Sequence, residues 1–220
     1  MTIKAVIFDL DGVITDTAQY HYIAWKQLAA SLGIEFGIED NERIKGLSRM
    51  ASLDIILGMG QMPLNEPGRL KLAEVKNQHY LTLIETMSAE DILPGTERVL
   101  AKLKQKNYKI GLASASKNAL KVLDKLGLSA QFDYIADAHS VENSKPHREV
   151  FLKVATALNV SPNECVAVED AVAGVEAIKR AGMYAVGIGC EKVLYDANVV
   201  LEGLNEFNLE DIIARTNVTA

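Results

Sequence analysis

A run of apolar residues that ends in acidic ones, KAVIFDL at residues 4–10, lies close to the start of the chain. Such a run predicts a strand that is buried on both faces, which is typical of a parallel sheet. Similar short apolar runs recur along the chain, and amphipathic stretches separate them. This alternation predicts an α/β fold in which helices cover both faces of a parallel sheet. The predicted strands are residues 4–10, 108–113, 132–136, 165–168 and 184–188, and the predicted helices are residues 97–106, 119–126, 149–158 and 172–181.

Residues 16–87 interrupt this alternation, because their apolar residues follow helical spacing and include no clear buried strand. A first helix is expected over residues 18–32, ended by Gly33. A second is expected near residues 53–57, and a third helix or a pair over residues 70–84. Glycines and prolines between positions 58 and 68 are expected in loops. We therefore predict an α/β core domain formed by residues 1–15 and 88–220, with a helical cap domain, residues 16–87, inserted after the first strand.

The composition limits the kinds of partner. The chain has 220 residues with 23 Lys and Arg against 29 Asp and Glu, a net charge of −6. This balance gives no basic surface for nucleic acid or an anionic membrane, and no apolar run reaches the roughly 18 residues of a membrane span. The first residues lead directly into a strand and lack the layout of a signal peptide. Cys165 and Cys190 fit neither a disulfide framework nor a zinc cluster, so we expect a cytoplasmic protein without nucleic-acid or membrane partners.

Polar side chains follow the predicted strands at the edge of the sheet where open parallel sheets bind ligands. Several carboxylates that face one crevice repel one another unless a hard cation neutralises them. Mg²⁺ accepts carboxylates, waters and phosphate oxygens as ligands, so we expect this ion as the cofactor. It would also screen the repulsion between a carboxylate nucleophile and an anionic phosphate. The residues at this edge are Asp9, Asp11, Ser114, Glu169 and Asp170, with Lys145 in a nearby loop.

The spacing of Asp9, Leu10 and Asp11 suggests two chemical roles. Residues two apart in an extended chain point to the same side, so Leu10 is expected to pack inward while both carboxylates face the crevice. One carboxylate can then attack phosphorus while the other exchanges a proton with the substrate oxygen. Gly12 allows the chain to turn away directly afterwards. An acidic pair alone can equally well end a strand and cap a turn, so a longer motif is needed to decide.

The longer string FDLDGVITDT, residues 8–17, resembles the nucleophile motif of the haloacid dehalogenase (HAD) superfamily. GLASASKN, SKP and AVEDAVAG, at residues 111–118, 144–146 and 167–174, resemble the second, third and fourth motifs of that superfamily. All four occur in order across the chain, and the resemblance implies a Rossmann-like HAD fold. It further implies Asp9 as nucleophile, Asp11 as general acid and base, Ser114 and Lys145 as phosphoryl ligands, and Asp9, the Asp11 backbone carbonyl and Asp170 as metal ligands, with Glu169 close by.

Segments of the predicted cap resemble the β-phosphoglucomutase family within this superfamily, among them IKGLSRMASL at residues 44–53 and VKN at residues 75–77. Two cations beside a flexible glycine suit a loop that lies over a sugar and binds a second phosphate, and arginine binds phosphate with two parallel hydrogen bonds. The resemblance implies a hinge at Thr17, with His21 and Lys76 positioning Asp11 when the cap closes. The substrate-binding residues that it implies are Lys45, Gly46, Arg49, Ser52, Lys76, Ser114, Ala115, Ser116, Lys117, Asn118 and Lys145.

The activity implied by this resemblance is interconversion of β-D-glucose 1-phosphate and D-glucose 6-phosphate through phospho-Asp9 and β-glucose 1,6-bisphosphate. We expect the protein to be a monomer. The principal alternative is a sugar-phosphate phosphatase, because Asp11 serves both reactions. A phosphonate hydrolase fits less well, since that branch generally lacks an acid two residues after the nucleophile. A non-catalytic sensor of sugar phosphates would not need the nucleophile Asp9.

One departure from the resemblance follows Lys145. The third motif usually continues as SKPDP, whereas His147 and Arg148 stand here after Pro146. Basic residues at the start of a helix are unfavourable for the helix dipole, by less than about 1 kcal/mol when they are exposed. We expect phosphate binding to survive, because Lys145 and Pro146 are intact.

Overall fold

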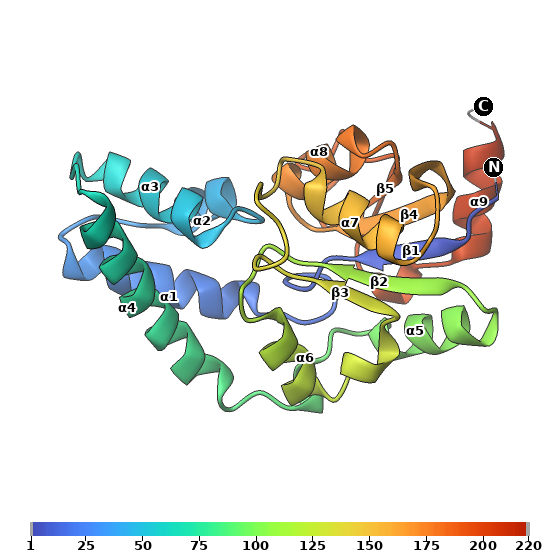
Figure 1. Cartoon of the computed structure of the whole chain (residues 1–220), viewed down its shortest axis with the longest axis horizontal. Coiled ribbons are helices and arrows are strands. Elements are labelled where there is room, and N and C mark those ends of the chain that lie inside the picture. Colours follow the sequence, from blue (N-terminus) through green and yellow to red (C-terminus); the bar gives the residue numbers. More distant parts are fainter. Residues whose placement is uncertain (1, 219–220) are drawn as a thin grey trace.

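A parallel sheet forms the centre of the computed structural model, which describes residues 2–218 (Figure 1). The described residues form a six-stranded sheet of order β3-β2-β1-β4-β5-β6, in which all neighbours are parallel. This is a Rossmann-like order, and it confirms the predicted fold class and the five predicted strands. The strands are β1 (Ala5–Phe8), β2 (Lys109–Ala113), β3 (Tyr134–Ala136), β4 (Cys165–Glu169), β5 (Tyr184–Ile188) and β6 (Val199–Leu201).

The strand β6 is absent from the sequence-based prediction. It has three residues, all half-buried, at the edge of the sheet next to β5. An edge strand pairs on one side only, so a short apolar run without alternation is enough to form it. Its position is set by pairing with Val186–Ile188 rather than by any pattern of its own.

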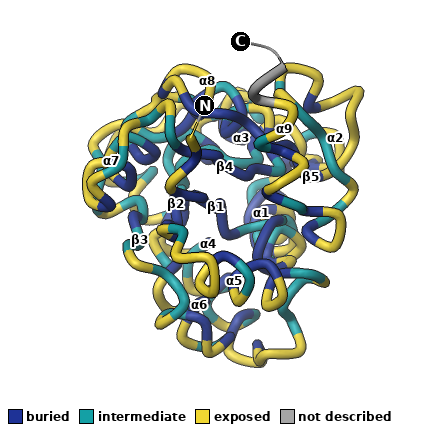
Figure 2. The backbone as a smooth tube through the Cα atoms, turned by 90° about the vertical axis from the view of Figure 1, so that its right-hand side faces the viewer, coloured by how far each residue is buried: buried dark blue, intermediate teal, exposed yellow. Residues whose placement is uncertain are grey.

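Two helical layers cover the sheet, and alternate residues of β1 face each of them. Val6 and Phe8 belong to one apolar cluster, whereas Ala5 and Ile7 belong to another on the opposite face. All four residues are buried, and Figure 2 shows the central strands β1 and β4 in dark blue. The first cluster includes residues of α5 (Thr96–Gln105), α6 (Ala119–Leu126) and α9 (Leu209–Val218), and the second includes residues of α7 (Glu149–Ala157) and α8 (Val172–Arg180).

The inserted segment forms helices beyond one end of the sheet (Figure 1). They are α1 (Ala18–Ser31), α2 (Ile38–Ile44), α3 (Arg49–Met59) and α4 (Glu66–Ile84). A third apolar cluster, which includes Trp25, Leu28 and Leu53, lies among them. We therefore propose the division into a core of residues 1–15 and 88–220 and a cap of residues 16–87. The two parts share apolar contacts, since Ala24 of α1 and Tyr80 of α4 pack in the cluster of the sheet.

Two expectations for the cap were wrong. Helix α2 was not expected, because its sequence IEDNERI has apolar residues only at its two ends. Pro67 and Gly68 were expected in a loop but lie in the first turn of α4. A proline is tolerated there, because amides of the first turn have no hydrogen-bond partner within the helix. The Asn65 side chain caps this helix by accepting a hydrogen bond from the Gly68 amide at 3.0 Å. Gly58 likewise lies inside α3, whereas Gly33, with φ of +71°, follows α1 as expected.

Short 3₁₀ turns connect several of these elements, at Ala89–Asp91, Ser129–Gln131, Pro162–Glu164 and Leu204–Glu206. Within residues 2–218, no helix combines the length and the apolar character that crossing a membrane requires.

Candidate active site

The site begins where the strand order reverses, at the carboxyl ends of β1 and β4. Asp9 follows β1 directly, and its amide donates to the Val168 carbonyl at 2.9 Å, so that the sheet still holds its backbone. Leu10 is fully buried beneath it. Asp11 is two residues further along and lines the same cleft as Asp9, as the spacing predicts. This reversal point is where open α/β sheets bind ligands.

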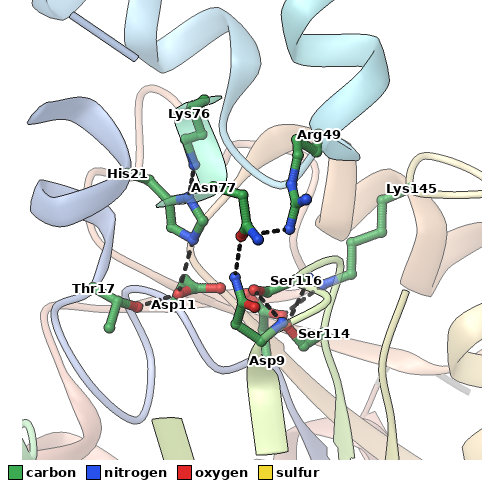
Figure 3. A network of polar contacts seen from close by, with 11 residues as sticks. Asp9, Asp11, Thr17, His21, Arg49, Lys76, Asn77, Ser114, Ser116 and Lys145 are labelled. Carbon is green, nitrogen blue, oxygen red and sulfur yellow. Dashed lines mark hydrogen bonds and ion pairs between the residues drawn. The ribbon is translucent and has the colours of Figure 1, made fainter. Parts of the chain in front are cut away.

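A buried lysine pairs with the carboxylates at this edge. The Lys145 Nζ atom lies 2.8 Å from Asp9 Oδ1 (Figure 3). It also lies 2.5 Å from Glu169 Oε1, and the Lys145 side chain is fully buried. Burial alone would lower the pKa of Lys145, but the two carboxylates outweigh it and raise that pKa above its ordinary value. Lys145 is therefore a permanent cation beside Asp9, in a position suited to hold a transferring phosphoryl group.

Three carboxylates form the candidate metal site. Oxygen atoms of Asp9, Glu169 and Asp170 all lie within 4.8 Å of one another. Carboxylate oxygens grouped in this way are the ligands that a hard divalent cation prefers, so the residues fit such an ion. Both Glu169 oxygens already have partners, because Oε1 contacts Lys145 and Oε2 accepts from the Ala171 amide at 2.9 Å. Asp9 and Asp170 are therefore the carboxylates best placed to bind an ion directly.

Two glycines leave room for these carboxylates. A Cβ atom on Gly12 would overlap the Asp170 carboxylate, and Gly12 also has a φ of +81°. A Cβ atom on Gly174, in the first turn of α8, would overlap the Glu169 carboxylate. The backbone thus approaches both acids more closely than any other residue would permit.

Replacing Gly174 with alanine is expected to lower the free energy of unfolding by about 2–3 kcal/mol, because the added methyl group displaces Glu169 from Lys145. The rate of phosphoryl transfer should also fall in this variant. Thermal and urea unfolding measure the effect. The matched control is Gly58→Ala, also in a helix but with no atom within 4 Å of the added Cβ, which should stabilise by about 0.5–1 kcal/mol. Equal stability of the two variants would contradict the steric argument.

A second set of contacts surrounds Asp11. The Thr17 hydroxyl donates to Asp11 Oδ1, and His21 Nε2 lies 3.7 Å from the same oxygen (Figure 3). Thr17 is the N-cap residue of α1, yet its side chain bonds Asp11 and caps no amide of the helix. The Lys76 Nζ atom lies 2.6 Å from His21 Nδ1, and the His21 ring stacks on Tyr80 with centroids 4.1 Å apart. Residues of α1 and α4 thus reach the general-acid candidate of the core.

Burial shifts the protonation of this set. Burial raises the pKa of Asp11 to about 6, the charge of Asp9 adds to the shift, and the bond from Thr17 opposes it. Burial, reinforced by the charges of Lys76 and Arg49, lowers the pKa of His21 well below its ordinary value. The lowered pKa favours neutral His21, and when the Lys76 ammonium donates to its Nδ1 atom, the ring proton is on Nε2, toward Asp11. Burial and the charge of Arg49 lower the pKa of Lys76 to about 7.

The cap closes the cleft with a loop between α2 and α3. Lys45 lies 2.9 Å from Glu42 and 4.0 Å from Asp170 of the core. Gly46 has a φ of +73°, and a Cβ there would lie 3.1 Å from that of Ala171, so this loop rests on the core. Arg49 is the first residue of α3 and points into the cleft.

The segment after β2 forms the opposite wall. Ser114 is fully buried, and its Oγ atom accepts from the Ser116 amide at 3.0 Å. The Ser116 Oγ atom accepts from the Asn118 amide at 3.1 Å, directly before α6. These hydrogen bonds fold the segment so that Ala115, Ser116 and Lys117 line the cleft.

The cleft has an empty volume of about 720 Å³, including the part open to solvent. The predicted residues that line it are Asp9, Asp11, His21, Lys45, Gly46, Arg49, Ser52, Lys76, Ala115, Ser116, Lys117 and Asp170. Thr17, Ser114, Lys145 and Glu169 are buried next to these residues, and Asn118 contacts Asn77. The prediction missed Asn41, which lines the cleft from α2. It also missed Asn77, which contacts Arg49, and the resemblance of the VKN segment was the signal that included this residue.

The chain matches the haloacid dehalogenase-like hydrolase family over residues 3–182. It therefore belongs to this family, as its fold and strand-end residues indicate. It is 46% identical to β-phosphoglucomutase of Bacillus subtilis over 94% of this chain and 92% of that protein. It is 49% identical to a β-phosphoglucomutase of Clostridium difficile whose crystal structure matches with a TM-score of 0.95 over 99% of both chains. Hexitol phosphatase B of Escherichia coli K12 is 33% identical over 96% of this chain and 97% of that protein.

Proposed function

We propose that the chain is a β-phosphoglucomutase, which interconverts β-D-glucose 1-phosphate and D-glucose 6-phosphate. The observation that carries this proposal is that one cleft holds two sets of side chains suited to bind phosphate. Lys145 and Ser114 lie beside Asp9 (Figure 3). Arg49 of the cap and Ser116 of the opposite wall line the cleft, and Asn77 joins Arg49 to Asn118. A mutase must hold one phosphate at each place. The two β-phosphoglucomutase relatives, at 46% and 49% identity over nearly the whole chain, support the same activity.

The proposed reaction starts from phosphorylated Asp9. The 6-hydroxyl of β-glucose 1-phosphate attacks phosphorus, Asp11 takes the hydroxyl proton, and the bond from phosphorus to the Asp9 oxygen breaks. The resulting 1,6-bisphosphate then reverses its orientation in the site, so that the phosphate on C1 faces Asp9. Asp9 then attacks the phosphorus on C1, and Asp11 returns the proton to the departing sugar oxygen, which leaves glucose 6-phosphate and restores phospho-Asp9. A bisphosphate or another phosphoryl donor must supply the first phosphoryl group.

Mg²⁺ is the proposed cofactor, held by Asp9, Asp170 and the Asp11 backbone carbonyl with Glu169 close by. When bound, it neutralises charge on the transferring phosphoryl group. In the proposed mechanism, Lys145 and Ser114 orient the phosphoryl group, and the cap excludes water. We also propose that the enzyme acts as a monomer, since one chain supplies every residue of the site.

Mg²⁺ should stabilise the protein more strongly at high pH than at low pH. Burial, together with the charges of Glu169 and Asp9, raises the pKa of Asp170 well above its ordinary value. Without metal, the folded state keeps this proton where the unfolded state has lost it, so stability falls as the pH rises through the folded pKa. Mg²⁺ replaces the proton, and at about one hundred times its dissociation constant it should add about 2.7 kcal/mol once Asp170 is ionised.

Thermal unfolding with and without Mg²⁺ at about pH 5 and about pH 8 tests this expectation. Asp170→Asn should abolish the Mg²⁺-dependent shift, whereas Asp196→Asn, at an exposed position, should keep it. A shift of the same size at both pH values would contradict the proton competition.

A sugar-phosphate phosphatase is the second candidate, supported by the similarity to hexitol phosphatase B. Both reactions use the same carboxylates, so the core residues do not separate them. What separates them is the acceptor of the phosphoryl group, which is a second sugar phosphate in the mutase and water in the phosphatase. The residues proposed to bind a second phosphate favour the mutase.

A ³¹P NMR time course of the purified protein with β-glucose 1-phosphate, Mg²⁺ and a bisphosphate primer decides between them. The mutase converts the substrate to glucose 6-phosphate with little inorganic phosphate. Phosphate release faster than isomerisation would establish the phosphatase instead. The α anomer, which places its phosphate differently relative to the ring, serves as the control substrate and should not be converted.

A further inference from the structure

The amide side chain of Asn77 in α4 joins the cap to the core. The Asn77 Oδ1 atom accepts a hydrogen bond from Arg49 Nη2 at 2.8 Å and another from Asn118 Nδ2 at 3.0 Å. Arg49 starts the cap helix α3, whereas Asn118 directly precedes the core helix α6. Figure 3 shows Asn77 beside Arg49, above the carboxylates. A single oxygen atom thus links two groups that the proposed function assigns to the second phosphate.

The chemistry of this acceptor suits a phosphate site. Arginine has five N–H donors, so the bond to Asn77 fixes the plane of the guanidinium and leaves other donors free for a ligand. An amide oxygen is neutral, so it orients Arg49 without neutralising its charge. A carboxylate at position 77 would make the same two bonds but would compete with the phosphate as an anion.

The position of Asn77 on α4 also matters. The preceding residue, Lys76, contacts His21, which faces Asp11. Consecutive residues of one helix therefore reach the second phosphate site and the general-acid candidate. The contact of Asn77 with Asn118 holds α4 against the core, next to the place where His21, which Lys76 contacts, faces Asp11.

We propose that Asn77 is a positioning residue for the second, non-reacting phosphate of the substrate, which orients Arg49 and ties the closed cap to Asn118. This inference rests on the proposed function. It assigns Asn77 no contact with the reacting atoms, and it predicts that Asn77 acts only on ligands that carry the second phosphate.

The test compares wild type with Asn77→Ala, using Gln78→Ala as the matched control at an exposed neighbouring position of α4. A lost hydrogen bond to a charged group changes affinity by about tenfold or more. The dissociation constant of glucose 6-phosphate, measured by calorimetry with Mg²⁺ and beryllium fluoride in place of the Asp9 phosphoryl group so that the sugar phosphate can occupy only the second site, should rise by about that factor in Asn77→Ala, and so should the KM for β-glucose 1-phosphate. Phosphorylation of Asp9 by acetyl phosphate, which has no second phosphate, should stay within about twofold of wild type.

Two further variants separate positioning from a general structural role. In an Arg49→Ala background, Asn77→Ala should add little, because the group that it orients is gone. Asn77→Asp retains both hydrogen bonds and should keep the thermal midpoint, yet it should bind glucose 6-phosphate at least as weakly as Asn77→Ala. Full additivity with Arg49→Ala, or wild-type affinity in Asn77→Asp, would overturn the inference.

The calorimetric measurement keeps this inference separate from the mutase activity. A wild-type protein that binds glucose 6-phosphate but does not isomerise it would contradict the proposed function while the affinities still report on Asn77. Equal affinities of wild type and Asn77→Ala would overturn the role of Asn77 alone.

Discussion

Asp9→Asn is expected to reduce phosphoryl transfer by about 10⁵-fold, the scale on which loss of a covalent nucleophile acts. An amide nitrogen or oxygen does not form the acyl phosphate through which the proposed reaction passes. The fold should persist, because the asparagine oxygen can still accept from Lys145, whose ammonium retains Glu169 as a charged partner. The measurement is the initial rate of glucose 6-phosphate formation, together with intact-protein mass after incubation with acetyl phosphate.

The mass measurement makes this prediction specific to Asp9. Wild type and the control Asp196→Asn should each gain one phosphoryl group, and Asp9→Asn should gain none. A phosphorylated Asp9→Asn protein would show that another residue is the nucleophile. Unfolding of the variant would instead show that Asp9 is chiefly required to neutralise Lys145.

Asp11→Asn should slow transfer between enzyme and sugar by about 10²–10⁴-fold, the usual contribution of a general acid or base. The sugar oxygen is a poor leaving group without a proton, and a sugar hydroxyl is a poor nucleophile without a base. Acetyl phosphate has a weakly basic leaving group and needs little help from an acid. Phosphorylation of Asp9 by acetyl phosphate should therefore be affected far less than transfer from β-glucose 1,6-bisphosphate, and single-turnover rates with the two donors measure the difference.

The pH dependence of the wild type follows from the same residue. The pKa of Asp11 is raised to about 6, chiefly by burial. Asp11 must be ionised to accept the sugar proton, so transfer from phospho-Asp9 to the sugar should fall as the pH drops below about 6. That inflection should vanish from the residual activity of Asp11→Asn. An unchanged inflection in the variant would assign the titration to another group.

The raised pKa of Asp11 also affects the stability of the folded protein. This stability falls as the pH rises, whereas the rate of transfer increases. Between its ordinary value and about 6, Asp11 holds more protons in the folded state than in the unfolded state. Its ionisation therefore costs stability as the pH rises through this window. Asp11→Asn removes that cost, so in metal-free protein the variant should be the more stable one near neutral pH.

Local patterns in the sequence were sufficient for the strands and for the strand-end residues. The run from Ala5 to Phe8 is apolar at every position, which is typical of a strand covered on both faces. The DxD spacing predicts that Asp9 and Asp11 lie on one side of an extended chain, and both line the cleft although β1 itself ends at Phe8. These features depend on neighbours in the chain, and so the order of residues determines them.

The resemblance to known motifs supplied the partners that local patterns do not define. Lys145 lies 136 positions after Asp9, and nothing in either segment specifies their separation of 2.8 Å. The packing of β1 against β4, and of the loop before α7 above them, brings the two together. The roles assigned to the individual site residues stay predictions for the experiments described above.

The sequence by itself determined the α/β architecture, the presence of a helical insertion and the acidic strand ends. Only the tertiary structure decided the contacts between cap and core. Thr17 turns its hydroxyl toward Asp11 instead of capping α1, and Asn77 receives donors from Arg49 and Asn118. The segments that contain these residues would be helical with or without such contacts. The periodicity of the sequence therefore does not predict the contacts. They exist because the sheet and the cap helices, each stabilised by its own apolar cluster, meet across the cleft.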